Sequence, residues 1–161
     1  MIRVFFRPCG KTYREQHTAA YELLDAAVSF LGMTCGHIEK TEHGKPYFPD
    51  RPDLFFSLSH TDGFAVCAVG DEPCGIDIEA EREITERIRD RFLGGASQEE
   101  ALLRWTQRES YGKLEGRGFF AGEIPPEARF VTFRELEGYL VTLCFLGHTE
   151  TVFHPVPLSD S

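Results

Sequence analysis

The sequence lacks the marks of several protein classes. Its five cysteines are odd in number and include no CxxC pair, so neither a zinc site nor a disulfide framework is indicated. No run approaches the roughly 20 apolar residues of a membrane span, and the opening MIRVFFRPCGK does not resemble a secretory signal. The patterns GxxxxGK[ST], GxGxxG, HExxH and GxSxG are also absent. We therefore expect a protein of the reducing cytoplasm that has no membrane partner.

Basic residues are also scarce. The chain has 17 Lys and Arg against 26 Asp and Glu, a formal net charge of −9. A nucleic-acid partner is disfavoured, because neutralising phosphates needs a basic face. A small phosphate-rich ligand is still allowed, since one basic pocket can exist on an acidic body. A solvated acidic face is the plain reading of the densest acidic stretch, which contains Asp71, Glu72, Asp77, Glu79, Glu81 and Glu83.

The pattern of apolar residues predicts an α+β protein. The 161 residues are 42% hydrophobic and include 14 Phe, enough for a sizeable core. Period-two and short apolar runs predict strands at Ile2–Phe6, Leu54–His60, Phe64–Val69, Cys74–Glu79, Arg129–Phe133, Tyr139–Phe145 and Thr151–His154. Helical spacing predicts helices over Ala20–Leu31, Ile84–Phe92 and Ser97–Glu115, with Glu100 completing a capping box for the last one.

The order of these elements suggests mostly antiparallel sheet. Strand–helix–strand pieces occur in both parts of the chain, although no sequence repeat is visible. We therefore expect one domain over residues 1–161 made of two similar α/β halves, about 1–70 and 71–161. Each half would carry its helices on one face of its sheet, and the two would pack as one body.

The segment Gly75-Ile76-Asp77-Ile78-Glu79 places two carboxylates on one side of a strand. Alternate residues of a strand share a face, so Ile76 and Ile78 would enter the core. Asp77 and Glu79 would project together, about 7 Å apart, and could converge on one cation. A solvent-facing strand with two acids is the alternative.

Trp105, Glu109 and Lys113 are spaced four residues apart and form one stripe on a helix. Trp105 would anchor the stripe in the core, with the acid and the base following at one-turn intervals. An ordinary surface Glu–Lys pair is the alternative reading of the second and third residues.

Two further fragments contain residues suited to phosphate. In Phe55-Phe56-Ser57-Leu58-Ser59-His60, the two serines share one face of the strand, and His60 stands at its end. In Gly44-Lys45-Pro46, Lys45 supplies a point charge in a Gly/Pro-rich connection. A packed or surface histidine and an ordinary loop lysine are the alternatives.

Together these fragments resemble one known family. HGKPYFPDRPDLFFSLSHTDG, GIDIE and WTQRESYGKLEGRG are similar in order, spacing and identity to the signature blocks of the 4'-phosphopantetheinyl transferases. The resemblance runs from about His43 to Phe119 and is greatest to the surfactin-synthetase-activator type, whose single chain holds two similar halves. It implies transfer of the 4'-phosphopantetheine group from coenzyme A to a serine of an apo acyl or peptidyl carrier protein, releasing adenosine 3',5'-bisphosphate.

The resemblance also implies roles by motif position. The implied ligands of Mg²⁺, with Mn²⁺ as the alternative metal, are Asp77, Glu79 and Glu109. The implied contacts to coenzyme A, chiefly through its phosphates, are Lys45, Ser59, His60 and Lys113. Glu109 and Lys113 are expected to act in catalysis, Glu109 as general base and Lys113 at the reacting centre. We expect a monomer.

The sequence departs from the family pattern in two places. Arg108 stands where the tryptophan block usually has lysine, which keeps the charge. The region before Gly44 is shorter than in many relatives, and Arg14 is the nearest candidate there for a nucleotide-pocket cation. Two other functions stay open: a Mg²⁺-dependent phosphohydrolase, and an inactive relative that binds coenzyme A or a carrier protein without transfer.

Overall fold

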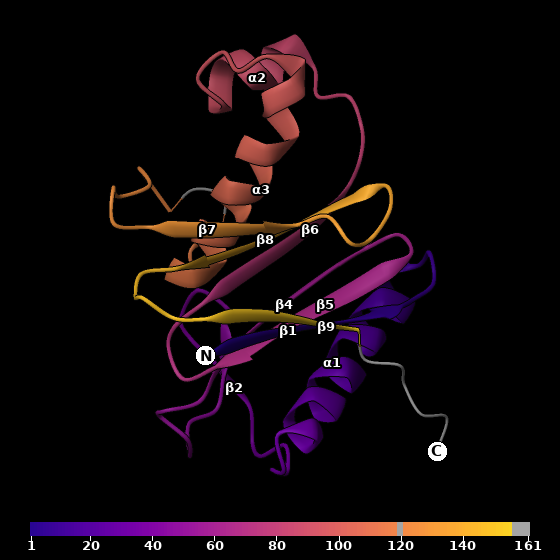
Figure 1. Ribbon diagram of the computed structural model, residues 1–161, viewed down its shortest axis with the longest axis vertical. Helices are drawn as coiled ribbons and strands as arrows, with labels where there is room; N and C mark the ends of the chain where they lie inside the picture. Colours follow the sequence, from indigo (N-terminus) through magenta and orange to yellow (C-terminus); the bar gives the residue numbers. More distant parts are fainter. Residues whose placement is uncertain (119–120, 156–161) are drawn as a thin grey trace.

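The computed structural model describes residues 1–118 and 121–155 (Figure 1). Phe119, where the family resemblance ends, lies outside the described residues. The strands are β1 (Ile2–Pro8), β2 (Glu39–Lys40), β3 (Pro46–Tyr47), β4 (Phe55–Thr61), β5 (Phe64–Gly70), β6 (Gly75–Ala80), β7 (Arg129–Phe133), β8 (Tyr139–Phe145) and β9 (Thr151–Pro155). The helices are α1 (Tyr13–Phe30), α2 (Glu86–Phe92) and α3 (Gln98–Glu115).

The strands form two main sheets and one short hairpin. The first sheet has the order β4-β5-β1-β9 and the second has the order β6-β8-β7, while β2 pairs with β3. Every pairing is antiparallel except that of β1 with β9. The predicted α+β class with mostly antiparallel sheet is therefore confirmed. Strand β5, which follows β4 in the chain, lies between β4 and β1, and β8, which follows β7, lies between β7 and β6.

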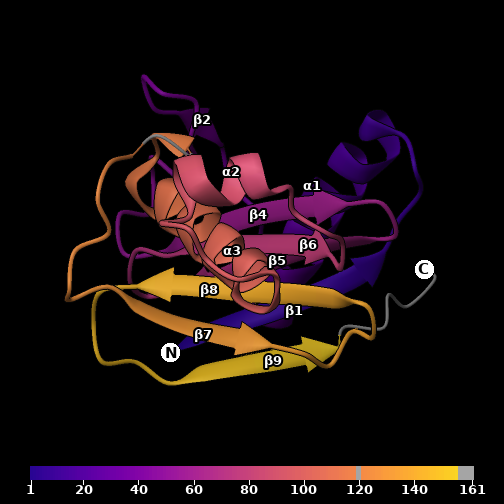
Figure 2. The same cartoon turned by 90° about the horizontal axis from the view of Figure 1, so that it is seen from above.

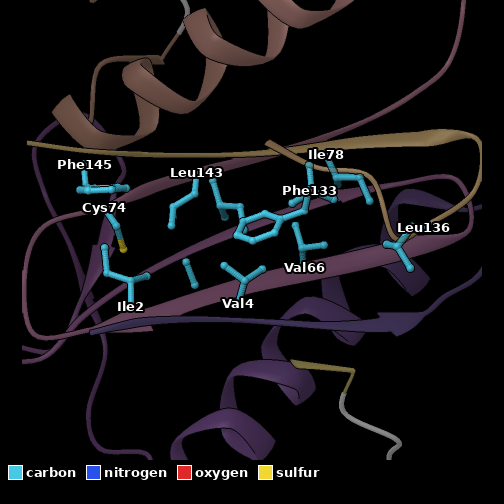
Figure 3. Packing of buried hydrophobic residues seen from close by; sticks show 12 residues of the cluster. Ile2, Val4, Val66, Cys74, Ile78, Phe133, Leu136, Leu143 and Phe145 are labelled. Atoms are coloured by element: carbon cyan, nitrogen blue, oxygen red, sulfur yellow. The ribbon is translucent and has the colours of Figure 1, made fainter. Parts of the chain in front are cut away.

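The molecule has four layers, with a helix outside each sheet (Figure 1). The two sheets face each other across a core that includes Ile2 and Val4 of β1, Ile76 and Ile78 of β6, and Leu143 of β8. Figure 3 shows side chains of this core, Ile2, Val4, Ile78 and Leu143 among them, meeting between the sheets. Viewed from above, α3 crosses the second sheet over β6 and β8 (Figure 2). The predicted inward direction of Ile76 and Ile78 is confirmed.

Helix α1 covers the outer face of the first sheet. Leu23, Leu24, Ala27 and Val28 are fully buried there, against side chains of β1, β4 and β5. The Thr12 side chain accepts a hydrogen bond from the Glu15 amide, so the helix begins earlier than its apolar stripe indicates. Apolar spacing identifies the buried face of a helix, but its exposed first turn carries no such signal.

Three expectations need correction. The Ser97 side chain makes no capping hydrogen bond to the helix it precedes, and Glu100 instead pairs with Arg104 one turn on. Ile84 lies before α2 and not in it, buried beside α3 in a small apolar cluster. Strand β9 was expected to belong to the second half, residues 71–161, but it pairs with β1 and joins the first sheet. Within the described ranges, the helices are too short or too polar to traverse a lipid bilayer.

Candidate active site

The two sheets meet at a seam where serine side chains take the place of backbone acceptors. The Ser57 hydroxyl accepts a hydrogen bond from the Ile76 amide (3.0 Å), and the Ser59 hydroxyl accepts one from the Ile78 amide (3.2 Å). Edge strands β4 and β6 are therefore joined although they belong to different sheets. Strand alternation correctly placed both serines on one face of β4, but their partner strand is a tertiary feature.

Asp77 is buried at this seam. Its side chain is exposed by only 6%, and its Oδ1 accepts a hydrogen bond from the Ser59 hydroxyl at 3.3 Å. The Lys113 ammonium lies 3.8 Å from the same oxygen. Burial raises the pKa of Asp77 well above its ordinary value; the Lys113 charge opposes this shift, while Glu79 and Glu109 add to it. The alternative of a solvent-facing acid is thus wrong for Asp77.

Glu79, two residues along β6, is held by two donors. The Trp105 indole N–H donates to its Oε1 at 3.0 Å, and the Arg82 guanidinium donates to its Oε2 at 2.8 Å. Trp105 packs against the small apolar cluster that includes Ile84 and Leu102, as expected of an anchoring residue. The tryptophan stripe of α3 therefore contacts the acidic face of β6.

Helix α3 can approach β6 this closely because residue 75 is glycine. A Cβ at Gly75 would lie 1.9 Å from the Ser110 carbonyl oxygen and 2.5 Å from the Leu114 amide, both in the backbone of α3. The helix places Glu109 and Lys113 over the strand. Burial raises the pKa of Glu109, with the Glu79 charge adding to the shift and the Lys113 and Arg82 charges opposing it. The Lys113 ammonium also donates to the Leu58 carbonyl at 3.1 Å.

Lys45 connects the β2–β3 hairpin to the end of α3. Its ammonium donates to three backbone carbonyls, those of Lys113 (2.7 Å), Leu114 (3.0 Å) and Cys74 (3.3 Å). Cations are favourable at a helix C-terminus, where the last carbonyls lack partners in the helix. Burial lowers the pKa of Lys45. In this structure Lys45 caps α3, a role that its motif did not indicate.

His60 lies at the end of β4 against helix α1. Its Nδ1 is 2.9 Å from the Gln16 side-chain oxygen, and its ring meets those of Tyr13 and His17 edge to face. Burial, together with the nearby charges of Lys113 and His17, lowers the pKa of His60. The imidazole is therefore neutral near pH 7 unless an anion stabilises its charged form.

A cavity of about 290 Å³ lies between α1, the hairpin, β4 and the end of α3. Three of the predicted residues line it: Lys45, His60 and Lys113. Ser59 and the acids Asp77, Glu79 and Glu109 are outside its lining, and Arg14 of α1 is too. The residues that sequence reasoning missed are His17, Tyr21, Lys40 and His43. His43 begins the HGKP block but was given no role there. Nothing in the local sequence marks the other three, since helix α1 and the hairpin meet here only in the folded chain.

The fit of a metal ion can be judged from the acids themselves. Within residues 1–118 and 121–155, no three His, Cys, Asp or Glu side chains already stand in a metal-holding arrangement. The Asp77 Oδ2, however, is buried and has no hydrogen-bond partner among the described residues. The charges of Glu79 and Glu109 also raise the pKa of Asp77, and the charge of Glu79 raises the pKa of Glu109, as carboxylates do when they share a small volume. Oxygen donors of this kind suit Mg²⁺, so the residues present fit a hard divalent cation.

Comparison with known proteins gives several similar sequences. The 4'-phosphopantetheinyl transferase Sfp of Bacillus subtilis is 35% identical over 89 residues, which cover 48% of this chain and 40% of that protein. The 4'-phosphopantetheinyl transferase gsp of Aneurinibacillus migulanus is 36% identical over 93 residues, covering 50% and 38%. The 4'-phosphopantetheinyl transferase HetI of Nostoc is 31% identical over 129 residues, covering 66% and 54%.

These matches confirm the resemblance that the motifs indicate. The chain spans about half the length of the curated relatives it matches, between 38% and 54% of each of these three. A scan of the chain against models of protein families finds no match. The similarity is therefore to part of each transferase.

Proposed function

We propose that this protein transfers the 4'-phosphopantetheine group of coenzyme A to a serine of an apo acyl or peptidyl carrier protein. The observation that carries the proposal is the buried Asp77, one of whose oxygens has no hydrogen-bond partner in the described part of the chain, beside Lys113 at the edge of a lysine-lined cavity. The similarity to three 4'-phosphopantetheinyl transferases supports the same assignment.

Coenzyme A is the substrate that suits the cavity. Three lysines and three histidines line it on a chain with net charge −9, so basic side chains are concentrated where a phosphate-bearing ligand would bind. Its volume of about 290 Å³ lies just below the range for ligand pockets, roughly 300 to 1,000 Å³. We expect it to hold the phosphate-bearing part of the molecule, with His60 and Lys113 as direct contacts. Lys45 would shape the wall, and Ser59 would act through Asp77.

Asp77, Glu79 and Glu109 would hold Mg²⁺, or Mn²⁺, next to this cavity. When bound, the metal would offset negative charge on the pyrophosphate and on the departing adenosine 3',5'-bisphosphate. Asp77 Oδ2 has no hydrogen-bond partner among the described residues, whereas Glu79 already accepts from two side chains, one of them a cation.

The chain's own residues supply the rest of the chemistry. The carrier serine oxygen forms a bond to the phosphorus that carries the pantetheine arm, and the bond from that phosphorus to the bridging oxygen of the pyrophosphate breaks. Glu109 would accept the serine proton, and its raised pKa brings it closer to the value that suits a general base near neutral pH. Lys113, held by the Leu58 carbonyl, would neutralise charge that develops on the phosphoryl oxygens.

The test is intact-mass spectrometry of an apo carrier protein incubated with the enzyme, coenzyme A and MgCl₂, with EDTA as the control. A metal-dependent gain of one phosphopantetheine group is the expected result. Glu109→Gln should lose most of the turnover, while Glu99→Gln, an exposed change in the same helix, should not. Full turnover by Glu109→Gln at saturating magnesium would remove Glu109 as the base.

The same reaction separates the two alternatives. A phosphohydrolase would release adenosine 3',5'-bisphosphate without any carrier protein, so release must be measured with and without the carrier. An inactive relative would bind coenzyme A and leave fatty-acid and peptidyl carriers unmodified.

We also infer that the two halves are structural duplicates within one monomeric domain. In support, β1-α1-β4-β5 and β6-α3-β7-β8 have the same order, and each unit pairs its last strand between the other two. A reducing cytoplasm stays a prediction, with which the five free thiols are consistent.

A further inference from the structure

Glu79 differs from Asp77 in that side-chain donors, one of them a cation, engage both of its carboxylate oxygens. The Arg82 guanidinium donates to Oε2 at 2.8 Å, and the Trp105 indole donates to Oε1 at 3.0 Å. The guanidinium also lies over the Trp105 ring, 5.6 Å from its centroid. Both carboxylate oxygens are therefore engaged by side chains, whereas Asp77 keeps an oxygen without a partner among the described residues.

The two donors differ in how freely they can move. Trp105 is part of α3 and packs on an apolar cluster. Arg82 follows β6 in a segment without helix or strand, and 44% of its side chain is exposed, against 20% for Glu79. A long exposed side chain can leave its partner at small cost, because exposed ion pairs contribute little. Of the two donors to Glu79, Arg82 is thus the one that a metal ion can displace.

Arg82 also acts electrostatically on more than its direct partner. Its charge opposes the rise in the pKa of Glu109, so the guanidinium lies within electrostatic reach of a second proposed ligand. A single positive charge here offsets part of the repulsion among three acids, as a divalent ion would do more fully.

We propose that Arg82 competes with the metal ion for the Glu79 carboxylate. It binds Glu79 in the metal-free protein and must release it when the divalent cation binds. The inference rests on the proposed function, since it assumes that Glu79 is a metal ligand. Trp105 keeps its hydrogen bond and orients the carboxylate, while Arg82 turns into solvent. Arg82 thereby sets how tightly the site binds its metal, without being a ligand itself.

Removal of the guanidinium should therefore tighten metal binding. Arg82→Gln should bind Mn²⁺ about two- to fivefold more tightly than the unmodified protein, the factor expected for an exposed ion pair. Arg82→Lys retains a positive charge and should stay within about twofold of the unmodified protein. Arg87→Gln removes one charge from an exposed position in the adjacent α2 and is the matched control, with unchanged affinity expected.

Mn²⁺ titration offers two readouts that do not depend on catalysis. Trp105 is the single tryptophan of the chain, so paramagnetic quenching of its fluorescence reports binding next to Glu79. Electron paramagnetic resonance counts the free Mn²⁺, and Mg²⁺ should reverse the quenching by competition. Each titration is run with and without coenzyme A, after circular dichroism has verified that the variants are folded.

The outcomes separate this inference from the proposed function. Tighter binding by Arg82→Gln, with Arg87→Gln unchanged, supports competition. Equal or weaker binding by Arg82→Gln would overturn it while leaving the metal site intact. Absence of Mn²⁺ binding to every form, even with coenzyme A, would overturn the proposed metal site and this inference together.

Discussion

Asp77 is a buried acid whose removal should stabilise the metal-free protein. The Ser59 hydroxyl and the Lys113 ammonium contact only its Oδ1, and its Oδ2 has no hydrogen-bond partner among the described residues. The pKa of the carboxyl is raised from 3.8 chiefly by burial, which outweighs the opposing charge of Lys113. The ionised form is therefore unfavourable in the fold, and Asp77→Asn removes that charge while preserving the shape of the side chain.

The magnitude follows from the buried charge, because asparagine keeps a polar atom in the place of Oδ2 and removes only the charge. An unsatisfied buried polar group costs about 1 to 3 kcal/mol, and a charged one costs roughly twice as much. At this chain length 1 kcal/mol corresponds to roughly 2 to 4 °C in Tm. Asp77→Asn should therefore raise Tm by about 2 to 12 °C in EDTA at neutral pH. The amide can still accept from Ser59, and the weakened contact with Lys113 reduces the gain.

The pH dependence has a defined sign. The folded state binds the Asp77 proton more tightly than the unfolded state does, so the stability of the unmodified protein falls as pH rises from 3.8 to the higher folded pKa. The advantage of Asp77→Asn should be complete above that window and should vanish below it.

Thermal denaturation in EDTA and in MgCl₂, over a series of pH values, measures these effects. Magnesium should stabilise the unmodified protein and not Asp77→Asn, so the difference between them should narrow or reverse when the metal is added. Asp25→Asn, at an exposed position of α1, should leave Tm unchanged. A lower Tm for Asp77→Asn in EDTA at neutral pH would refute the view that burial dominates at this site.

Three further changes test other parts of the site. Lys45→Met leaves three carbonyls without their donor and should cost about 2 to 4 kcal/mol in urea unfolding; an unchanged midpoint would contradict the capping role. Gly75→Ala drives a methyl group against the Ser110 carbonyl and should cost about 1 to 3 kcal/mol and reduce transfer, whereas Gly36→Ala, in open space, should do neither. His60 has a lowered pKa, so its charged form is scarce near neutral pH. Calorimetry should show the affinity for adenosine 3',5'-bisphosphate rising several-fold more between pH 7.5 and 5.5 in the unmodified protein than in His60→Gln, and equal slopes would exclude His60.

Much of the fold could be predicted from local pattern. The spans of β7 and β8 match the predicted ranges, and the other strands predicted from the sequence differ by one or two residues at their ends. Those segments have alternating or continuous apolar residues because their side chains are buried in the core. Such a pattern can be recognised in the sequence directly. The hairpin of β2 and β3 is two residues long on each side and too polar to leave such a trace.

The faces of the site were also determined by the sequence. Alternation along β6 put Asp77 and Glu79 opposite Ile76 and Ile78, and helical spacing put Trp105 on the stripe that reaches Glu79. These statements need only the periods of a strand and a helix.

Only the tertiary structure decided which of these faces meet, and what each charge does there. Lys45 was predicted as a phosphate contact, yet its ammonium donates to two carbonyls of α3 and to the carbonyl of Cys74. Arg82 carried no signal at all, yet it holds Glu79. Local periodicity encodes the direction of a side chain, whereas its partner depends on how distant segments pack. A buried charge takes whichever partner the fold brings within hydrogen-bond distance.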